Sequence, residues 1–275
     1  MNKLSNELKQ KLIRLKTIIK DYDSLLIAFS GGVDSTLLLK VAHEELDASL
    51  LAVTAFSSIY DEKECQFAVS FAENNGIRHL TFQSEKGNIP GFNENPPDRC
   101  YLCKRDLIIR LRQLAQQYHI NAIADGTNAD DLNDYRPGMR AALEFGVVHP
   151  LKEAGLNKTE IREISRAMGL ETWNKPANPC LATRFPYNET ITPERLNRVR
   201  EAENWLRDRN FKIFRVRSHE NLARIEFAPD EIERGFTMRE KIASTLKKIG
   251  FTFVCIDCQG YRMGSLNEAL KPDDS

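Results

Sequence analysis

The chain has 275 residues, and its 39 Lys and Arg balance 39 Asp and Glu, so the formal net charge is zero. That length suits one large α/β domain with a smaller partner domain, while the even charge gives no support for nucleic acid as a ligand. No apolar run approaches the ~20 residues of a membrane span, and the N-terminal stretch lacks the features of a signal peptide. We therefore expect a cytoplasmic protein without a membrane partner, in which the six cysteines stay reduced.

Strands and helices alternate through the first half of the chain. Helices are predicted from their apolar spacing at residues 2–20, 33–46, 61–76 and 100–118. Short apolar runs predict buried strands at residues 24–29, 50–56, 77–82 and 121–128. This alternation implies right-handed βαβ units, and hence a doubly wound parallel sheet with helices on both faces.

The second half changes character after a helix at 157–170 and a proline-interrupted loop at 173–187. Thr192 and Pro193 are typical of a helix start, and alternating strands, one long helix and a final strand follow. These elements are expected at residues 192–209, 211–219, 222–228, 229–250 and 251–258. The domain boundary is therefore placed near residue 186, giving an α/β domain over 1–186 and a smaller α+β domain over 187–275.

The stretch IAFSGGVDSTLLL joins a strand to a helix through Ser30, Gly31 and Gly32. Glycines let the backbone approach an anion closely, and the N–H groups of a helix start favour phosphate. No G-K-[ST] follows, so this is not a Walker loop. Asp34 is suited to holding Mg²⁺ against bound phosphates, and Ser35 adds a hydroxyl donor. A tight turn without a ligand is the alternative, which the complete S-G-G-x-D-S pattern disfavours.

This S-G-G-V-D-S string resembles the PP-loop ATP pyrophosphatases, which split ATP between its α- and β-phosphates and adenylate a carbonyl or carboxyl oxygen. The resemblance implies a doubly wound fold, and it places Val53 and Thr54 of the second strand at the adenine. It also implies that the turn formed by Asp125, Gly126 and Thr127 closes over the nucleotide, at the edge where open α/β sheets bind ligands.

Three further segments resemble the LarE family of ATP-dependent sacrificial sulfur transferases. They are DGTNADDLNDYRPGMRAA (125–142), WNKPANPCLATRFPY (173–187) and RVRSHENLARIE (215–226). The resemblance implies adenylation of a carboxylate of pyridinium-3,5-biscarboxylic acid mononucleotide, followed by replacement of oxygen with sulfur. The product is a precursor of the nickel-pincer nucleotide cofactor. It further implies a second domain that binds substrate and forms homo-oligomers.

Cys180 occupies the position of the sulfur-bearing cysteine in this family. In sacrificial members that cysteine gives up its own sulfur and becomes dehydroalanine. A reacting thiolate needs nearby positive charge, and Lys175 and Arg184 lie within five residues of Cys180 in the sequence. A small core hydrophobe is the alternative, which the surrounding Pro, Asn and Arg residues disfavour.

Cys100 and Cys103 form a C-x-x-C pair that single-cysteine members of the family lack. Other relatives use such a pair with one distant cysteine to hold a [4Fe-4S] cluster, so the resemblance implies a cluster on Cys100, Cys103 and Cys180, with one iron left to deliver sulfide. A zinc site is the second interpretation. Its fourth ligand would come from Cys255 or Cys258, which we expect instead on a strand, as core and edge residues.

Several charged residues are candidate ligands or catalytic groups. Arg215 and Arg217 share one face of a strand and suit a substrate phosphate, against the alternative of two solvated arginines. The resemblance places Glu203 and Glu226 near the cysteine, as metal ligands or a base. Lys104, Arg136 and Arg140 are candidates for neutralising pyrophosphate or substrate carboxylates, against ordinary surface charges.

Three other functions fit parts of the sequence. A tRNA thiolase would share the adenylation and cluster chemistry, but the neutral charge disfavours a large anionic substrate. An amide-forming ligase of the GMP- or NAD-synthetase kind would share the phosphate loop, but it gives the three cysteines no role. A non-catalytic iron–sulfur protein would not need the intact phosphate loop.

Overall fold

The computed structural model describes residues 4–133 and 137–270. The chain divides into two compact units, the first comprising the described residues up to Glu85 together with Cys100–Asn178. The second unit comprises Lys86–Arg99 and the described residues from Pro179 onward. The chain therefore passes into the second unit before the boundary placed near residue 186, and the loop at 86–99 belongs to that unit as well.

A parallel sheet forms the centre of the first unit. Its strands are β1 (Leu25–Ala28), β2 (Leu50–Phe56), β3 (His79–Gln83) and β4 (Ala122–Ala124). The strand order is β3-β2-β1-β4, every pairing is parallel, and Ala124 forms a further parallel bridge with Val148. The chain thus reverses direction across the sheet between β1 and β4, which confirms the expected doubly wound topology.

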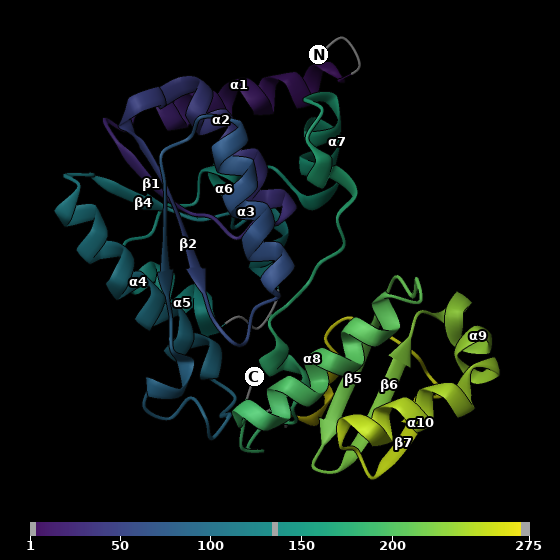
Figure 1. Ribbon diagram of the computed structural model, residues 1–275. Coiled ribbons are helices and arrows are strands. Elements are labelled where there is room, and N and C mark those ends of the chain that lie inside the picture. The colour runs from purple at the N-terminus through teal and green to yellow at the C-terminus, as the bar shows by residue number, and fades with distance from the viewer. Residues whose placement is uncertain (1–3, 134–136, 271–275) are drawn as a thin grey trace. The chain divides into compact units, whose positions relative to one another are not determined.

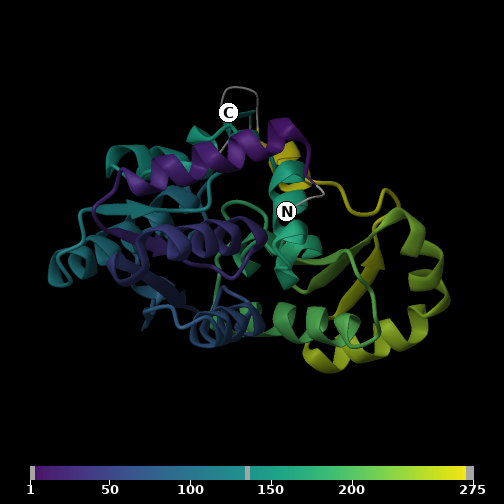
Figure 2. The ribbon, with the colours of Figure 1, turned by 90° about the horizontal axis from the view of Figure 1, so that it is seen from above.

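Helices cover both faces of this sheet. They are α1 (Asn6–Lys20), α2 (Val33–Leu46), α3 (Glu62–Asn74), α4 (Arg99–Gln117), α5 (Pro137–Glu144), α6 (Pro150–Glu153) and α7 (Lys158–Ala167). Successive residues of β1 point to opposite faces: Leu25 and Ile27 pack with α1, α2 and α7, and Leu26 packs with α4 and α5. Figures 1 and 2 show α1 lying alongside α2 on the first of these faces.

The predicted helices of the first unit match these elements closely, and α5 and α6 are additional. Leu8, Leu12, Leu15 and Ile19 are the buried face of α1, as their spacing predicted. Asn157 caps α7 in a reciprocal pair with Glu160. Short 3₁₀ turns lie at Asp47–Ser49, Lys86–Asn88, Ala129–Asn133, Glu171–Asn174, Leu181–Arg184, Pro229–Glu231 and Ser265–Ala269.

The second unit contains a small mixed sheet. Its strands are β5 (Phe214–His219), β6 (Leu222–Phe227) and β7 (Phe253–Ile256), in the order β5-β6-β7. β5 and β6 pair antiparallel, and β6 and β7 pair parallel. Its helices are α8 (Pro193–Arg207), α9 (Ile232–Thr237) and α10 (Arg239–Ile249). Thr192 caps α8 through the Arg195 amide, as predicted.

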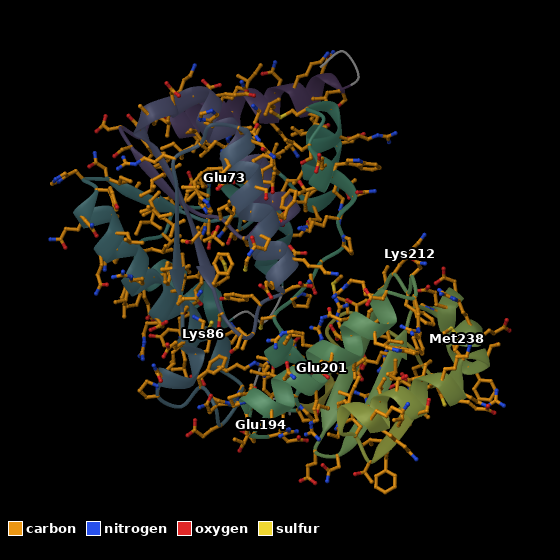
Figure 3. All side chains as sticks on the ribbon, viewed as in Figure 1. Glu73, Lys86, Glu194, Glu201, Lys212 and Met238 are labelled. Carbon is orange, nitrogen blue, oxygen red and sulfur yellow. The ribbon has the colours of Figure 1, made fainter. Side chains whose placement is uncertain are left out.

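Two expectations for the second unit are wrong. The single helix predicted at 229–250 is broken at Met238, labelled in Figure 3, whose φ of −89° and ψ of 5° leave the helical region. Just before it, the Thr237 hydroxyl donates to the Glu233 carbonyl, a contact that bends helices. The last strand ends at Ile256, and Cys255 and Cys258 are both exposed, so neither is a core residue.

Within the described ranges, no helix is long and apolar enough to cross a membrane.

Candidate active site

The loop after β1 has the geometry of an anion site. Gly31 adopts a φ of +72°, and a Cβ there would lie 2.9 Å from the Glu64 carbonyl oxygen, so the position requires glycine. The hydroxyls of Ser30 and Ser35 lie 3.0 Å apart across the turn. Gly32 is the N-cap of α2 and supplies no side-chain cap. The first amides of α2 are therefore left to a ligand.

The turn after β4 packs directly against this loop. A Cβ on Gly126 would lie 2.9 Å from the Ser35 amide nitrogen and 3.2 Å from the Asp34 Cβ. Only glycine permits so close an approach between the turn and the first residues of α2. The two segments meet at the carboxyl ends of β1 and β4, where the doubly wound sheet reverses direction and where such sheets bind ligands.

Asp34 projects from the first turn of α2 toward nitrogen donors from outside the helix. Its Oδ1 accepts a hydrogen bond from the Asn128 side-chain amide at 3.3 Å, and its Oδ2 forms an ion pair with the Lys158 ammonium. The Asp34 side chain is about one-fifth exposed, at 21%, so a ligand can reach it. Lys158 was not predicted from the sequence, where it looked only like part of a helix start.

Asp125 is the centre of a buried charged cluster. Its Oδ2 accepts from the Lys104 ammonium at 2.7 Å, and its Oδ1 lies 2.8 Å from Nδ1 of His149 and accepts from the Thr127 amide at 3.1 Å. Burial alone would raise the pKa of the Asp125 carboxyl, but Lys104 and His149 outweigh it and hold that pKa well below its usual range. Asp125 therefore stays ionised and fixes Lys104 beside the phosphate loop.

His149 is a site residue that no signal in the sequence identified. The five histidines have no ligand spacing, and His149 reaches Asp125 only because Val148 forms a bridge with Ala124 at the sheet edge. The residue is 5% exposed, and its Nε2 has no hydrogen-bond partner among the described residues. This buried nitrogen thus lacks the partner that most buried polar atoms have.

The change Asp125→Asn is expected to destabilise the protein by about 3–5 kcal/mol at neutral pH, because it leaves Lys104 beside a neutral amide in a buried site. Since the folded-state pKa of Asp125 is depressed, its contribution is present above the unfolded-state value of about 3.9 and is lost as the pH falls below it. Urea unfolding from pH 7 to pH 3 measures this. The gap between the two proteins should narrow in acid, and a constant gap would contradict the assignment.

Val53 and Thr54 are both buried on β2, at 2% exposure each. The Thr54 hydroxyl donates to the Phe29 carbonyl at 2.7 Å and lies 2.8 Å from Nε2 of His79. Burial lowers the pKa of His79. Thr54 thus ties β2 and β3 to the residue preceding the phosphate loop, and its proposed role at the adenine stays a prediction.

Cys100 and Cys103 are the second and fifth residues of α4, and side chains three residues apart on a helix share a face. Cys100 is exposed and Cys103 is half-buried, with its sulfur 3.9 Å from the Tyr60 hydroxyl. The six cysteines, all within the described ranges, form no disulfide. Lys104, the next residue, carries the ammonium that Asp125 holds.

Lys175 is already paired within the first unit, and its expected contribution of positive charge to Cys180 stays a prediction. Its ammonium lies in the first unit, 2.8 Å from Glu64 and 4.5 Å from the centre of the Phe67 ring. It also donates to the Gly31 carbonyl at 2.9 Å. Lys175 therefore supports the phosphate loop, because it holds the carbonyl of the residue with positive φ.

Cys180 lies in the second unit, half-buried just before the turn Leu181–Arg184. Arg184 is fully buried, and its guanidinium forms a two-point ion pair with Glu203, at 2.7 and 3.0 Å. Another guanidinium nitrogen donates to the Pro179 carbonyl at 3.1 Å. Burial opposes the charge of Arg184, but Glu203 outweighs it and raises the pKa of the guanidinium, with a smaller contribution from Cys180.

Glu203 is almost fully committed to protein partners. Besides Arg184, it accepts from the Val216 amide at 3.1 Å. Burial would raise the pKa of its carboxyl, but Arg184 outweighs burial and lowers it. The geometry thus accounts for Glu203 as the buried counter-ion of Arg184, which anchors the Cys180 loop to α8, and it leaves little capacity for a metal.

Arg215 and Arg217 are buried, at 9% and 7% exposure, so they are not two solvated arginines. Arg217 pairs with Glu226 at 2.8 Å and donates to the Thr183 carbonyl at 2.7 Å. The Arg215 guanidinium lies 4.9 Å from the centre of the Tyr261 ring. Burial, followed by the charge of Arg184, lowers the pKa of Arg215.

The remaining predicted site residues are only partly described. Arg136 lies outside the described residues. Arg140 lies on α5, with its guanidinium 4.1 Å from the centre of the Tyr101 ring. Within residues 4–133 and 137–270, no group of three or more His, Cys, Asp or Glu side chains is gathered as a metal site. The three-cysteine cluster, with ligands from both units, therefore stays a prediction.

A glycine turn opening onto a helix start, beside an acidic turn at the reversal point of a doubly wound sheet, defines an enzyme of the PP-loop class. A family model described as NAD synthase matches residues 3–125. A pyridinium-3,5-bisthiocarboxylic acid mononucleotide synthase of Lactiplantibacillus plantarum is 35% identical over 96% of this chain and 96% of its own length. The chain belongs to the LarE family of the PP-loop superfamily.

Two more relatives show the breadth of the similarity. An uncharacterised protein of Synechocystis is 43% identical, over 96% of this chain and 99% of its own length. A chain of the glutamine-hydrolysing GMP synthase of Thermococcus kodakarensis is 26% identical, over 72% of this chain and 68% of its own length.

Proposed function

We propose that this protein is an ATP-dependent sulfur transferase that acts on pyridinium-3,5-biscarboxylic acid mononucleotide. It adenylates a carboxylate of that substrate and replaces oxygen with sulfur, in the biosynthesis of the nickel-pincer nucleotide cofactor. The observation that carries the proposal is the similarity to the Lactiplantibacillus synthase along nearly the whole of both chains. The anion site at Ser30–Ser35 supports it independently, because adenylation requires a bound nucleotide.

In the first half-reaction the phosphates of ATP bind the amides and hydroxyls of Ser30, Gly31, Gly32 and Ser35. The residues present fit Mg²⁺, since Asp34 offers hard carboxylate oxygens on the accessible side of the α2 start. Mg²⁺, when bound, supplies positive charge to the phosphates. Lys104, whose ammonium is paired with Asp125, stabilises the negative charge on the departing pyrophosphate. The substrate carboxylate forms a bond to the α-phosphorus, and pyrophosphate leaves with the electrons of the broken bond.

In the second half-reaction a sulfur nucleophile attacks the acyl carbon, a C–S bond forms, and AMP leaves with the electron pair of the C–O bond. In the sacrificial route the nucleophile is the Cys180 thiolate. Loss of the Cys180 Cα proton and cleavage of its Cβ–S bond then leave the sulfur on the substrate and dehydroalanine in the chain. Arg184 supports this role, since it binds the carbonyls of the Cys180 loop and carries positive charge beside the thiol.

In the alternative route, Cys100, Cys103 and Cys180 hold a [4Fe-4S] cluster. The donor set suits it: three thiols outside any disulfide are present, two of them on one face of α4 near its start. The three cysteines would hold the cluster, which would supply a renewable source of sulfide-level sulfur, so that the cysteines would not be consumed. Zinc on the same thiols is the competing occupant.

Anaerobic purification with quantified iron, sulfide and zinc separates these routes. About four irons per chain, lost in Cys103→Ala, are expected for the cluster, whereas stoichiometric zinc would rule it out. Mass analysis after turnover gives the second readout: a loss of about 34 Da at Cys180, the mass of H₂S, marks self-sacrifice. The substitution Cys180→Ser should end sulfur transfer by either route while AMP formation continues.

The adenylation step has its own test. The purified protein, given Mg²⁺, ATP and the dicarboxylated pyridinium mononucleotide, should release AMP and pyrophosphate in equal amounts. Asp34→Asn should reduce this release by at least roughly a hundredfold, because the site loses the carboxylate that would hold Mg²⁺ against the phosphates. If the wild-type protein releases neither product, the proposed function is wrong, whatever the cysteines bind.

An amide-forming ligase is the second candidate. The family model and the GMP synthase relative favour it, but the family model covers only residues 3–125. Formation of AMP from ATP that requires both ammonia and a purine or nicotinate nucleotide as acceptor, with an aminated product, would identify this activity. For the sulfur transferase we also propose a homo-oligomer, which light scattering of the purified protein measures.

A further inference from the structure

Lys175 connects the phosphate loop to residues 173–183, the stretch that contains Cys180 and is called the Cys180 segment below. Its ammonium donates to the Gly31 carbonyl at 2.9 Å, and the Glu64 carboxylate balances its charge at 2.8 Å. Cys180 lies five residues farther along the chain. The proposed half-reactions use the phosphate loop first and Cys180 second, and they give Lys175 no part in joining the two.

The Gly31 carbonyl belongs to the same peptide group as the Gly32 amide. Glycine on both sides leaves this peptide group free to rotate unless a side chain holds it. A trans peptide group is planar, and its C=O and N–H point in opposite directions. Lys175, which holds the carbonyl, therefore fixes where the N–H points. That N–H donates a long hydrogen bond, 3.4 Å, to the Ser30 hydroxyl within the proposed anion site.

A phosphate at the Gly32 amide and the ammonium of Lys175 would thus bind opposite ends of one peptide dipole. An anion at the N–H polarises the peptide group and makes its carbonyl a stronger acceptor, and an ammonium at the carbonyl makes the N–H a stronger donor. Such coupling is reciprocal, so the Lys175 contact gains from nucleotide whatever the nucleotide gains from Lys175. Occupancy of the loop therefore changes how firmly Lys175 is held.

The first part of the Cys180 segment is held to the first unit at two further points. Arg162 of α7 donates to two carbonyls of the segment, those of Trp173 and Lys175, at 2.9 and 2.7 Å. The Asn178 side-chain amide donates to Asp61, the N-cap of α3, at 3.2 Å. The chain enters the second unit directly after Asn178. A firmer hold on Lys175 therefore restrains the end of the first unit, from which the chain continues to the sulfur-bearing cysteine.

We propose that Lys175 is a positioning residue that couples nucleotide binding to the Cys180 segment. With a phosphate on the Gly32 amide, Lys175 binds the Gly31 carbonyl more tightly and orders the segment. This role rests on the proposed use of ATP. It makes the cysteine well positioned only once the nucleotide that forms the adenylate is bound. No covalent bond is made or broken in this step.

Hydrogen–deuterium exchange of the full chain, with Mg²⁺ and a saturating α,β-methylene analogue of ATP, tests the coupling. In the wild type the analogue should slow exchange in the loop 29–35 and, by several-fold, in the Cys180 segment. In Lys175→Met, which keeps much of the apolar stem, the loop should still be protected, whereas the protection of the segment should be largely lost. Lys175→Arg, which keeps a charged donor, should retain part of it.

Lys63→Met is the matched control, since Lys63 is an exposed lysine next to Glu64 on the same helix. It should leave both protections as in the wild type. The side chains of Lys175 and Glu64 are each 23% exposed, so Lys175→Met is expected to fold.

Three outcomes would contradict the coupling and leave the proposed function standing. They are protection of the loop without the segment in the wild type, undiminished protection of the segment in Lys175→Met, and an unprotected loop in Lys175→Met. The second includes exchange that becomes faster to the same extent with and without the analogue, which marks a merely structural role. A wild-type loop that the analogue does not protect would instead contradict the proposed nucleotide site, and the coupling with it.

Discussion

Gly126→Ala is expected to weaken ATP binding by roughly ten- to a hundredfold while the chain still folds. The added methyl would lie 2.9 Å from the Ser35 amide nitrogen and 3.2 Å from the Asp34 Cβ, so the first turn of α2 must move. Overpacking of this kind costs about 1–3 kcal/mol, and the displaced amides are those proposed to bind phosphate. Calorimetry with a non-hydrolysable ATP analogue measures the loss.

Gly138→Ala is the matched control for this change. A Cβ there would meet the Cys100 carbonyl oxygen at 3.6 Å and the Lys104 Cβ at 3.7 Å, which are ordinary van der Waals contacts. Gly138 lies in α5, where alanine is the better helix former. The control should bind the analogue like the wild type. If Gly126→Ala also binds it normally, the loop after β1 is not the nucleotide site.

Arg184→Met is expected to destabilise the second unit by about 3–5 kcal/mol, because it leaves the Glu203 carboxylate buried without its counter-ion. Arg184 is 0% and Glu203 is 4% exposed at the side chain, so water cannot replace the lost partner. The Cys180 loop also loses the guanidinium that binds its carbonyls, so sulfur transfer should fall as well. Urea unfolding followed by tryptophan fluorescence measures the stability.

The double change Arg184→Met with Glu203→Gln distinguishes the cost of an unpaired buried charge from the cost of lost packing. It should recover part of the lost stability, since no uncompensated carboxylate remains. Arg239→Met serves as the exposed control: its side chain is 53% exposed, its contact with Glu240 is 3.8 Å long, and little change is expected. An Arg184→Met protein as stable as this control would contradict the assigned role of the Arg184–Glu203 pair.

The fold of the first unit could be predicted from sequence because its signals are local. β1 and β2 are short apolar runs, α7 begins at a capping asparagine, and α4 has an apolar face along its length. The parallel, doubly wound arrangement also followed from general rules of handedness. The break at Met238 could not be predicted this way, since the sequence 229–250 contains no proline or glycine at that point and the helical spacing continues through it.

In the candidate site, too, the residues that lie close together in the sequence could be predicted, and those that meet only in the fold could not. Gly31, Gly32 and Asp34 lie close together in the sequence, so their string alone pointed to a phosphate site. His149 contacts Asp125, and Lys158 contacts Asp34, from elements farther along the chain. No spacing in the sequence predicts such contacts. The ion pairs of the second unit could likewise not be predicted, because each joins two different elements: the turn Leu181–Arg184 and α8 in one case, and β5 and β6 in the other.

The division of the chain into units carries a consequence for anyone who wishes to study them apart. Carbonyls of Asn93 and Asn95, from the short excursion Lys86–Arg99, accept hydrogen bonds from the amides of Ile191 and Asn188 at 2.8 Å each. Arg99 itself is buried and donates to Asn95. A gene fragment starting at codon 187 would omit this excursion and therefore part of the smaller unit. A fusion that joins Lys86–Arg99 to the residues from Pro179 onward would supply both stretches without the part of the first unit that lies between them.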